Sequence, residues 1–370
     1  MYKVLHLIPT LAGGGAERQL SMLAVEQSLR GMDVHVGIRC GGVFEALLRK
    51  SGVKIHFLGN YKGIHPLLLF RVSKLIKKIK PDIIQTWLLQ MDIVGGLVAI
   101  WNSVTLIISE RTSDLAYKGI KKQAWLRCYL ARYAAAIVAN SSNGVDYWHN
   151  IKLKKIPVYK VANAIDISAI RSAVSNSKEK PEHNSTVHEI LVVGRYSTEK
   201  ASDTIIQSIN LIPDDYNIHV TFIGEGPLYD EMINSITEAG LNGRITLLPF
   251  LPSWWEKLKG ASALISMSRF EGQPNVVIET MSAGCPLIVS DIPAHREFLD
   301  EESAMLVPLD NAIVLAETIV AHLSDNDSAK YRAMKAMTYT ENLTIQLTAD
   351  AYESIYTKAL RDSNRECLFK

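Results

Sequence analysis

The chain has 370 residues, of which 48% are hydrophobic and 21% charged, and its formal net charge is +2. This composition is typical of a folded globular protein, argues against a disordered chain or a small disulfide-stabilised scaffold, and leaves room for two domains. The near-zero net charge is the sum of two halves of the chain with opposite net charges. Residues 1–180 hold 26 basic and 11 acidic side chains, a net charge of +15, whereas residues 181–370 hold 14 and 27, a net charge of −13. The first half therefore carries a surplus of cations that would attract anionic partners.

Apolar runs typical of buried strands alternate with helical patterns through the first half. The predicted strands span residues 3–8, 34–38, 54–58, 82–87, 105–109 and 136–140, and the predicted helices span residues 16–29, 44–50, 67–80, 92–101 and about 120–135. Strands that are apolar throughout, each followed by a helix, indicate a parallel sheet covered on both faces. Residues 1–166 are therefore predicted to form a doubly wound, Rossmann-like α/β domain.

A polar segment separates this domain from a second one. Residues 167–189 include the stretch SNSKEKPEHNSTVHE, which has no apolar period and is typical of a linker. The alternation then resumes, with strands predicted at residues 189–194, 220–224, 245–250, 263–267 and 286–291 and helices at 204–211, 228–239 and 274–283. A second Rossmann-like domain is predicted over residues 190–343, facing the first across a cleft. Residues 344–370 are predicted to form a C-terminal helix that crosses back to the N-terminal domain.

Cysteine spacing and hydropathy bear on the compartment. The four cysteines form no CxxC pair, so neither a zinc site nor a disulfide framework is indicated, and a reducing cytoplasm is expected. The apolar run at the N-terminus is too short for a signal peptide. The longest uncharged run, residues 93–109, is interrupted by Gly-Gly and Asn-Ser pairs and is predicted to be a buried helix and strand rather than a membrane span.

The first candidate binding element is the glycine run Gly13, Gly14 and Gly15, which lies between the first strand and its helix. In doubly wound sheets ligands bind beyond the carboxyl ends of the strands. Without Cβ atoms, this loop lets backbone N–H groups approach an anion at the helix N-terminus. The alternative is a tight structural turn, and the run does not fit the dinucleotide fingerprint GxGxxG.

Two further loops follow strands of the second domain. Arg195 and Lys200 lie five residues apart, where a planar guanidinium and a compact ammonium can converge on a diphosphate. Solvated loop charges are the alternative. The GEGP turn that begins at Gly224 follows the next strand and is predicted to be a tight turn beside a ligand.

The strongest motif is SRFEGQPNVVIETMSAGCP, residues 268–286. Pro274 suits the first turn of a helix, which places Glu271 in the preceding loop and Glu279 inside the helix. The helix N-terminus offers free N–H groups to a phosphate, and the two carboxylates can hold sugar hydroxyls on either side of a diphosphate. Two carboxylates also suit a glycoside hydrolase, but hydrolysis of a neutral sugar needs no anion-binding loops.

Taken together, these motifs resemble the retaining nucleotide-sugar glycosyltransferases of the GT-B fold, specifically family four. The matching pieces cover essentially the whole chain in order and spacing: GGAER (14–18), VANS (138–141), NAID (163–166), VGRYSTEK (193–200), GEGP (224–227) and the stretch 268–286 with its two glutamates.

The resemblance implies a role for each matching residue. As catalytic groups, Arg195 and Lys200 would neutralise the departing nucleoside diphosphate without a metal or another cofactor, and Glu271 would face the donor sugar. The donor-binding set would comprise Gly14, Gly15 and Gly224, the backbone N–H groups of Asn275 and Val276 at the phosphate, and Glu279 at the ribose. The acceptor would attack on the leaving group's own face, so no protein nucleophile is required.

One position departs from the family pattern. Many members carry a histidine near the donor sugar after the fifth strand, whereas this chain has the sequence Ser-Glu-Arg-Thr, with Arg111 in that place and Glu110 before it. Both residues are assigned to the acceptor or sugar side. Arg111 would contact sugar hydroxyls, a diphosphate on the acceptor, or only Glu110, and the histidine's role is not transferred to it.

The cations of the first half gather in residues 71–80 and 118–132. In the second stretch they alternate with Trp125, Tyr129 and Tyr133 on a predicted amphipathic helix, which suits a membrane interface or a lipid-linked anionic acceptor. The alternative is that the apolar residues of this stretch, which also include Leu126 and Leu130, form core and the cations only solvate its rim. No nucleic-acid-binding motif accompanies the charge, so nucleic acid is not an expected partner.

The expected protein is therefore a cytoplasmic retaining hexosyltransferase, associated peripherally with the anionic cytoplasmic face of the inner membrane. It would move a hexose or N-acetylhexosamine from a UDP-sugar to a polyprenyl-diphosphate-linked saccharide during bacterial polysaccharide biosynthesis, as in O-antigen or capsule assembly. Two alternatives stay open: a non-hydrolysing nucleotide-sugar epimerase of the same fold, and a non-catalytic subunit that binds a sugar nucleotide.

Overall fold

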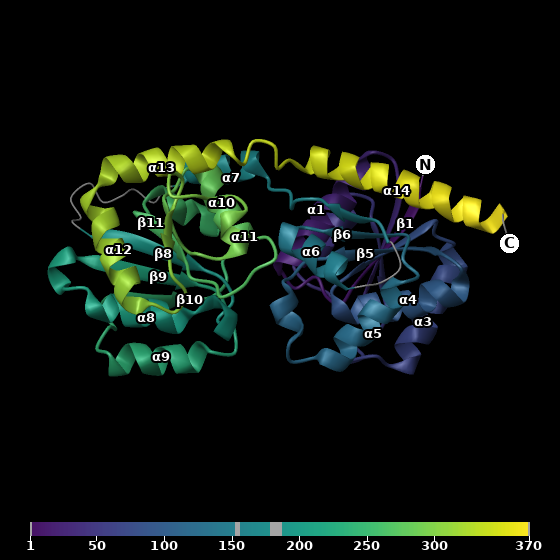
Figure 1. Cartoon of the computed structure of the whole chain (residues 1–370), viewed down its shortest axis with the longest axis horizontal. Helices are drawn as coiled ribbons and strands as arrows, with labels where there is room; N and C mark the ends of the chain where they lie inside the picture. The colour runs from purple at the N-terminus through teal and green to yellow at the C-terminus, as the bar shows by residue number, and fades with distance from the viewer. Residues whose placement is uncertain (1, 152–155, 178–186, 369–370) are drawn as a thin grey trace. The chain divides into compact units, whose positions relative to one another are not determined.

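The computed structural model describes residues 2–151, 156–177 and 187–368, and it divides into two compact units (Figure 1). Unit 1 comprises Met1–Ala164 and Leu343–Lys370, and unit 2 comprises Ile165–Asn342. Each unit is a parallel sheet with helices on both faces, which confirms the predicted pair of Rossmann-like α/β domains.

Unit 1 is built on a sheet whose described strands are all parallel. They are β1 (Lys3–Ile8), β2 (Asp33–Ile38), β3 (Lys54–Phe57), β4 (Ile83–Trp87), β5 (Thr105–Glu110), β6 (Ala136–Ala139) and β7 (Val158–Lys160). Their spatial order is β3-β2-β1-β4-β5-β6-β7. The order reverses between β1 and β4, and the carboxyl ends of strands beside such a reversal are where ligands bind in this fold.

The helices of unit 1 cover the sheet in two layers. One core layer packs α1 (Gly15–Leu29), α2 (Glu45–Lys50) and α14 (Ile345–Leu368) on the sheet, and the other packs α3 (Pro66–Ile79), α4 (Leu89–Asn102), the end of α5 (Lys121–Ala131) and α6 (Ser142–Asn150). The short helix η1 (Asp114–Tyr117) follows β5. Because α14 contributes the fully buried rings of Tyr352 and Tyr356 to the first layer, the end of the chain completes the core that its beginning forms.

Unit 2 repeats this plan. Its parallel strands are β8 (His188–Val193), β9 (Ile218–Ile223), β10 (Ile245–Leu248), β11 (Ala263–Ser266), β12 (Leu287–Ser290) and β13 (Met305–Val307), in the order β10-β9-β8-β11-β12-β13. The helices are α8 (Ser202–Leu211), α9 (Tyr229–Glu238), α10 (Asn275–Ala283), α11 (Pro293–Arg296), α12 (Ala312–Ser324) and α13 (Asn326–Thr338), with the short helices η2 (Thr198–Lys200), η3 (Asp214–Tyr216) and η4 (Trp254–Lys259). The order reverses between β8 and β11.

The structure corrects the prediction of an irregular linker over residues 167–189. The first ten of these residues form helix α7 (Ile167–Asn176), which Asp166 caps by accepting the Ala169 N–H at 2.9 Å. Ile170 is buried, and Arg171 donates to the Ser282 carbonyl of α10 at 3.2 Å. Small polar residues with one apolar position per turn are enough for a helix when a neighbouring helix covers that position. Residues 178–186 of the predicted linker lie outside the described residues.

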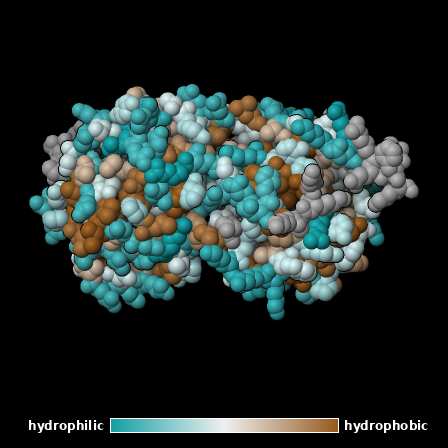
Figure 2. All heavy atoms as spheres, viewed as in Figure 1, coloured by the Kyte–Doolittle hydropathy of each residue, from teal (hydrophilic) through white to brown (hydrophobic). Residues whose placement is uncertain are grey.

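The surface mixes hydrophilic and hydrophobic residues over both units (Figure 2). No helix in the described part of the chain combines the length and the apolar character needed to cross a bilayer.

Candidate functional site

A pocket lies at the carboxyl ends of β8, β9 and β11 in unit 2. Its lining includes the backbone of Gly194 and the side chains of Arg195, Lys200 and Ser268. Because the strand order reverses between β8 and β11, the pocket occupies the position at which doubly wound sheets bind their ligands. The structure thus brings the predicted Arg195 and Lys200 together at one site.

Lys200, which lines this pocket, forms an ion pair with Glu271 of the loop after β11. The Lys200 ammonium lies 2.5 Å from Glu271 Oε1, which also accepts the Ser268 hydroxyl at 2.8 Å. Burial raises the pKa of the Glu271 carboxyl, but Lys200 and Ser268 outweigh it and hold that pKa below its usual range. Glu271 is therefore an anion that accepts hydrogen bonds. Ser268 belongs to the predicted motif, but its role follows only from the fold.

Arg195 presents a different environment in the same pocket. Its side chain is exposed, and the described residues provide no hydrogen-bond or ion-pair partner for its guanidinium. An unpaired guanidinium beside a paired ammonium leaves the pocket with a cation that is available to an anionic ligand.

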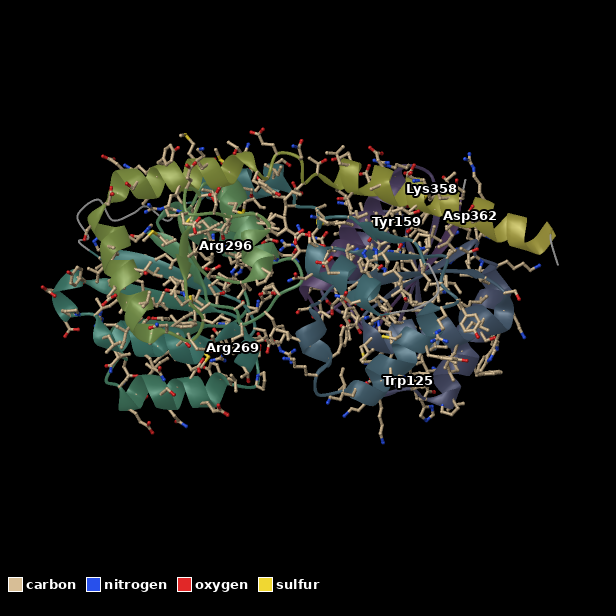
Figure 3. All side chains as sticks on the ribbon, viewed as in Figure 1. Trp125, Tyr159, Arg269, Arg296, Lys358 and Asp362 are labelled. Atoms are coloured by element: carbon tan, nitrogen blue, oxygen red, sulfur yellow. The ribbon has the colours of Figure 1, made fainter. Side chains whose placement is uncertain are left out.

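Arg269, which was not predicted as a site residue, links the loop after β11 to the segment that carries Lys200. Its guanidinium pairs with Asp310 at 2.7 Å and with Asp203 at 3.0 Å, and its backbone N–H donates to the Glu199 carbonyl at 2.8 Å (Figure 3). These contacts tie the loop after β11, which carries Glu271, to η2, which carries Lys200. No local sequence signal identifies this clamp, because its partners lie on three separate segments.

The GEGP turn supports the Arg195 loop through close packing. A Cβ atom on Gly224 would lie 1.9 Å from the Gly194 carbonyl oxygen, and one on Gly226 would lie 2.2 Å from the Tyr196 carbonyl oxygen. The Gly224 N–H already donates to the Leu248 carbonyl at 3.0 Å. The structure therefore gives Gly224 a packing role, and a contact between Gly224 and the donor stays a prediction.

Helix α10 places the second glutamate as the motif predicts, with Glu271 in the loop before the helix and Glu279 inside it. Glu279 is buried, and its Oε2 accepts the indole N–H of Trp255 at 2.8 Å. At the start of α10, the first-turn N–H groups, which include those of Asn275 and Val276, have no acceptor within the helix because of α-helix geometry. Trp255 was not predicted as a site residue, since it precedes Glu279 by 24 positions.

In unit 1 the glycine run opens helix α1. Gly13 adopts a left-handed backbone angle, with φ of 115°, and the next residue, Gly14, is the N-cap of the helix. Gly14 and Gly15 are exposed. A Cβ atom on Gly14 would lie 2.5 Å from the Glu17 carboxylate, which accepts the Thr10 hydroxyl at 2.9 Å. The absence of a side chain at Gly14 therefore leaves room for the Glu17 carboxylate beside the start of α1, and contact of Gly14 and Gly15 with the donor stays a prediction.

Arg111 lies just beyond the carboxyl end of β5, and distant residues hold it in place. Its guanidinium donates to Asn163 at 2.8 Å and to the Tyr352 hydroxyl of α14, and it stacks over the Trp87 ring with 4.4 Å to the centroid. The buried Arg111 Nε has no partner among the described residues. The side chain is half-buried, so a cation remains accessible at this edge of the sheet.

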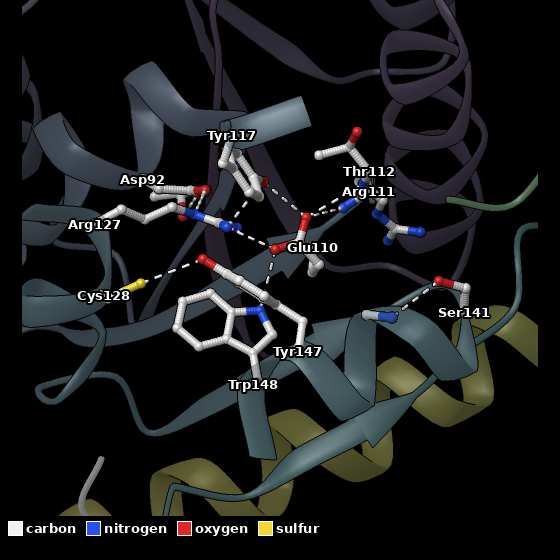
Figure 4. A network of polar contacts seen from close by, with 12 residues as sticks. Asp92, Glu110, Arg111, Thr112, Tyr117, Arg127, Cys128, Ser141, Tyr147 and Trp148 are labelled. Atoms are coloured by element: carbon white, nitrogen blue, oxygen red, sulfur yellow. Dashed lines mark hydrogen bonds and ion pairs between the residues drawn. The ribbon is translucent and has the colours of Figure 1, made fainter. Parts of the chain in front are cut away.

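Glu110 belongs instead to an internal network of charges and hydrogen bonds (Figure 4). Its Oε2 accepts from Arg127 at 2.6 Å and from the Trp148 indole at 3.1 Å, while Oε1 accepts the Tyr117 hydroxyl at 2.9 Å and the N–H groups of Arg111 and Thr112. This corrects the prediction that Glu110 contacts the acceptor or the sugar, because both carboxylate oxygens are occupied and the side chain is buried.

The basic stretch around α5 divides into an inner and an outer face. Arg127 is 1% exposed and pairs with Asp92 and Glu110, so it contributes nothing to the basic surface on which it was predicted to lie. The aromatic residues Trp125, Tyr129 and Tyr133 are 68%, 42% and 56% exposed; Trp125 stacks on Tyr129, and Tyr133 meets Tyr129 edge-on. The alternative that the apolar residues of this stretch form core is therefore wrong for the three rings, whereas Leu130 is buried as that alternative expects.

Among the residues that the structure describes, no group of three or more His, Cys, Asp or Glu side chains is arranged to hold a metal ion. The predicted independence of metal remains a prediction.

Family models match both units. One described as "Glycosyltransferase Family 4" matches residues 13–169, and one described as "Glycosyl transferases group 1" matches residues 174–339.

Similar proteins of known name act on lipid-linked sugars. A Campylobacter jejuni protein named N-acetylgalactosamine-N,N'-diacetylbacillosaminyl-diphospho-undecaprenol 4-alpha-N-acetylgalactosaminyltransferase is 25% identical over 357 residues, which are 91% of this chain and 94% of that protein. An Escherichia coli protein named UDP-Gal:alpha-D-GlcNAc-diphosphoundecaprenol alpha-1,3-galactosyltransferase is 26% identical over 259 residues, 63% of this chain and 64% of that protein.

The fold recurs among solved structures. The crystal structure of Anabaena HepE in complex with UDP and glucose matches with a TM-score of 0.85 at 18% identity and covers 96% of this chain and 100% of that chain. With a family model on each unit and this shared fold, the chain belongs to the GT-B glycosyltransferases of the family-four type.

Proposed function

We propose that this glycosyltransferase moves a hexose or N-acetylhexosamine from a UDP-sugar to a polyprenyl-diphosphate-linked saccharide, with retention of anomeric configuration and without a metal ion. The observation that carries the proposal is the Lys200–Glu271 pair at the strand reversal of unit 2, where Lys200 lines one pocket with Arg195, a cation without a partner among the described residues. Such a pocket combines two cations for a departing diphosphate with a carboxylate for sugar hydroxyls.

In the proposed reaction each predicted site residue of unit 2 has a separate role. Arg195 and Lys200 stabilise the negative charge that develops on the UDP leaving group, in the role that a metal ion has in other enzymes. Glu279 accepts from the ribose hydroxyls, the first-turn N–H groups of α10 contact phosphate, and Glu271 orients the donor sugar. Because Lys200 and Ser268 already engage Glu271, it serves as a hydrogen-bond acceptor. The acceptor hydroxyl attacks the anomeric carbon directly as the bond from that carbon to the UDP phosphate oxygen breaks, and its proton passes to that departing oxygen.

The proposed acceptor draws on two kinds of support. The names of similar proteins specify diphosphoundecaprenol-linked sugars, and unit 1 offers Arg111 at the carboxyl edge of its sheet. In this proposal Arg111 contacts the acceptor, and Gly14 and Gly15 present the N-terminus of α1 to the donor diphosphate.

Turnover by the pure protein tests the function. A panel of UDP-sugars is incubated with and without a synthetic polyprenyl-diphosphate-linked N-acetylglucosamine, and UDP release and product are measured. We expect one UDP-sugar to be consumed only when the acceptor is present, with an α-linked product from an α-linked donor and unchanged rates in EDTA. Acceptor-independent conversion of the UDP-sugar would identify an epimerase, and a melting-temperature increase without turnover would identify a binding subunit.

We further propose that the outer faces of α3 and α5 bind the anionic surface of the membrane. The two helices flank α4, and they expose aromatic and basic side chains together: Phe70, Lys74, Lys77, Lys121, Lys122, Trp125, Tyr129, Arg132 and Tyr133. Trp125 projects from α5 at the edge of unit 1 (Figure 3). Amphipathic rings flanked by cations suit the headgroup region of a bilayer with anionic lipids.

Vesicle binding should depend on this surface. In flotation with vesicles of phosphatidylglycerol and phosphatidylethanolamine, Lys121→Gln with Lys122→Gln is expected to weaken partitioning about 30-fold, since each basic residue contributes about 1 kcal/mol near an anionic surface. Trp125→Ala should weaken it further. Tyr331→Ala, which removes an exposed ring of unit 2, is the matched control. Binding that ignores salt, anionic lipid and these substitutions would contradict the membrane proposal.

A further inference from the structure

The network around Glu110 joins segments that are separate in the sequence (Figure 4). Arg127 of α5 donates to Asp92 of α4 at 2.7 Å and to Glu110 at the end of β5 at 2.6 Å. Asp92 in turn accepts the Thr86 hydroxyl of β4 at 2.6 Å. All of these side chains are buried, so the charges are held by one another and not by water.

The opposite oxygen of Glu110 shapes the loop that carries Arg111. Glu110 Oε1 accepts the backbone N–H of Arg111 at 3.1 Å and that of Thr112 at 3.2 Å. The Tyr117 hydroxyl donates to the same oxygen and accepts from Arg127, each at 2.9 Å. One carboxylate therefore binds α5 with one oxygen and the backbone of the Arg111 loop with the other.

Helix α5 itself has two faces. Arg127 points inward to Glu110, whereas Trp125 and Tyr129, two positions to either side of Arg127, point outward and are exposed. Buried hydrogen bonds and ion pairs thus link α5, whose outer face is the proposed membrane surface, to the loop that carries Arg111.

Stability alone is a weak explanation for such a cluster. Apolar replacements of buried ion pairs are often neutral or stabilising, whereas removal of one partner leaves a buried charge that is uncompensated. Here the charged atoms also fix two backbone N–H groups directly at Arg111, which an apolar core could not do.

We infer that Glu110, Arg127 and Tyr117 are positioning residues that hold Arg111 in register with helix α5, so that the cation meets the diphosphate of an acceptor anchored in the membrane at that helix. The inference rests on the proposed function for the identity of the acceptor. It adds residues that contact no substrate but hold the backbone of Arg111, while Asn163 and Tyr352 contact its guanidinium.

Tyr117→Phe and Tyr147→Phe are a matched pair for the test. Each removes one hydroxyl from the same cluster and keeps the ring, but the Tyr147 hydroxyl contacts Cys128 at 3.4 Å and does not reach Glu110. A triple variant, Asp92→Asn with Glu110→Gln and Arg127→Met, removes the ionic link and leaves no unpaired buried charge.

Hydrogen exchange of the peptide that contains Arg111 and Thr112 is the readout that does not depend on activity. We expect these amides to exchange about tenfold faster in Tyr117→Phe and faster still in the triple variant, because weakening their acceptor loosens the loop. Tyr147→Phe and peptides of unit 2 should match the wild type. Unchanged exchange in Tyr117→Phe, or an equal change in Tyr147→Phe, would overturn the inference.

Kinetics with the polyprenyl-diphosphate-linked N-acetylglucosamine separate positioning from general destabilisation. Tyr117→Phe should raise the KM for this acceptor about tenfold and leave the KM for the UDP-sugar unchanged. If both KM values rise together, the network is only structural and the inference fails. If exchange responds as expected but the wild type transfers no sugar to this acceptor, the proposed acceptor is wrong, while the link from α5 to the Arg111 loop stands.

Discussion

Lys200→Met is expected to lower kcat/KM for sugar transfer by about 10²- to 10³-fold, the range found when one preorganised donor to a developing anion is removed. The ammonium lies 2.5 Å from Glu271 and is one of two cations in the pocket of unit 2. Its loss takes charge stabilisation from the leaving diphosphate. It also removes the cation that holds the pKa of the Glu271 carboxyl low, so that pKa should rise.

The pH dependence makes this prediction specific. A raised pKa for Glu271 means that activity of Lys200→Met should fall off at a higher pH on the acid side than activity of the wild type, since the carboxylate protonates earlier as the pH decreases. Lys335→Met, which removes a surface partner of Glu302 in the same unit, is the control and should keep wild-type rates. Activity within threefold of the wild type in Lys200→Met would show that the donor diphosphate does not bind in this pocket.

Glu279→Ala is the second substitution with a large expected effect. If Glu279 accepts two ribose hydroxyls, its removal should reduce kcat/KM for the UDP-sugar by about 10²- to 10⁴-fold, because each hydrogen bond to a charged group contributes about 1.5–3 kcal/mol. The variant also leaves the indole N–H of Trp255 without the acceptor at 2.8 Å that it has now. Glu279→Gln keeps an oxygen for that N–H and should lose less, about tenfold.

Isothermal calorimetry with UDP and steady-state kinetics measure this effect separately on binding and on turnover. Glu238→Ala, at the exposed end of α9, is the control for a lost carboxylate in unit 2. Circular dichroism and the melting temperature establish that Glu279→Ala folds. A folded Glu279→Ala protein with full activity would contradict the assignment of the ribose site to α10.

Much of the donor side was predictable because its residues follow strands directly. A parallel sheet places the carboxyl ends of its strands at one edge, so Arg195, Lys200 and Glu271, each soon after a predicted strand, were expected to be neighbours. Pro274 marked the start of α10 and so predicted that Glu271 lies in the loop before the helix and Glu279 inside it. Each of these signals spans only a few residues and can be found in the sequence directly.

Local sequence signals did not predict the contacts of the residues on the proposed acceptor side, in unit 1. Glu110 was predicted to contact the acceptor or the sugar and Arg127 to belong to a basic surface, since charged residues are mostly exposed. The structure instead pairs them with each other in the core across 17 positions. Arg111 meets Tyr352 across 241 positions, from a helix at the other end of the chain. Neither partner can be named without knowing which elements pack together.

The amino-acid pattern predicted the alternation of strands and helices, the two sheets and the loops that carry the donor motifs, because periodicity and turn residues act over one element at a time. The packing of distant elements established which charges are buried. It turned residues 167–176 into a packed helix, gave Glu271 its partner, and exposed Trp125 while it enclosed Arg127 on the same helix. The physical reason is that burial and pairing depend on neighbours brought together by folding, and a charge moves into the core only where the fold supplies its counterion.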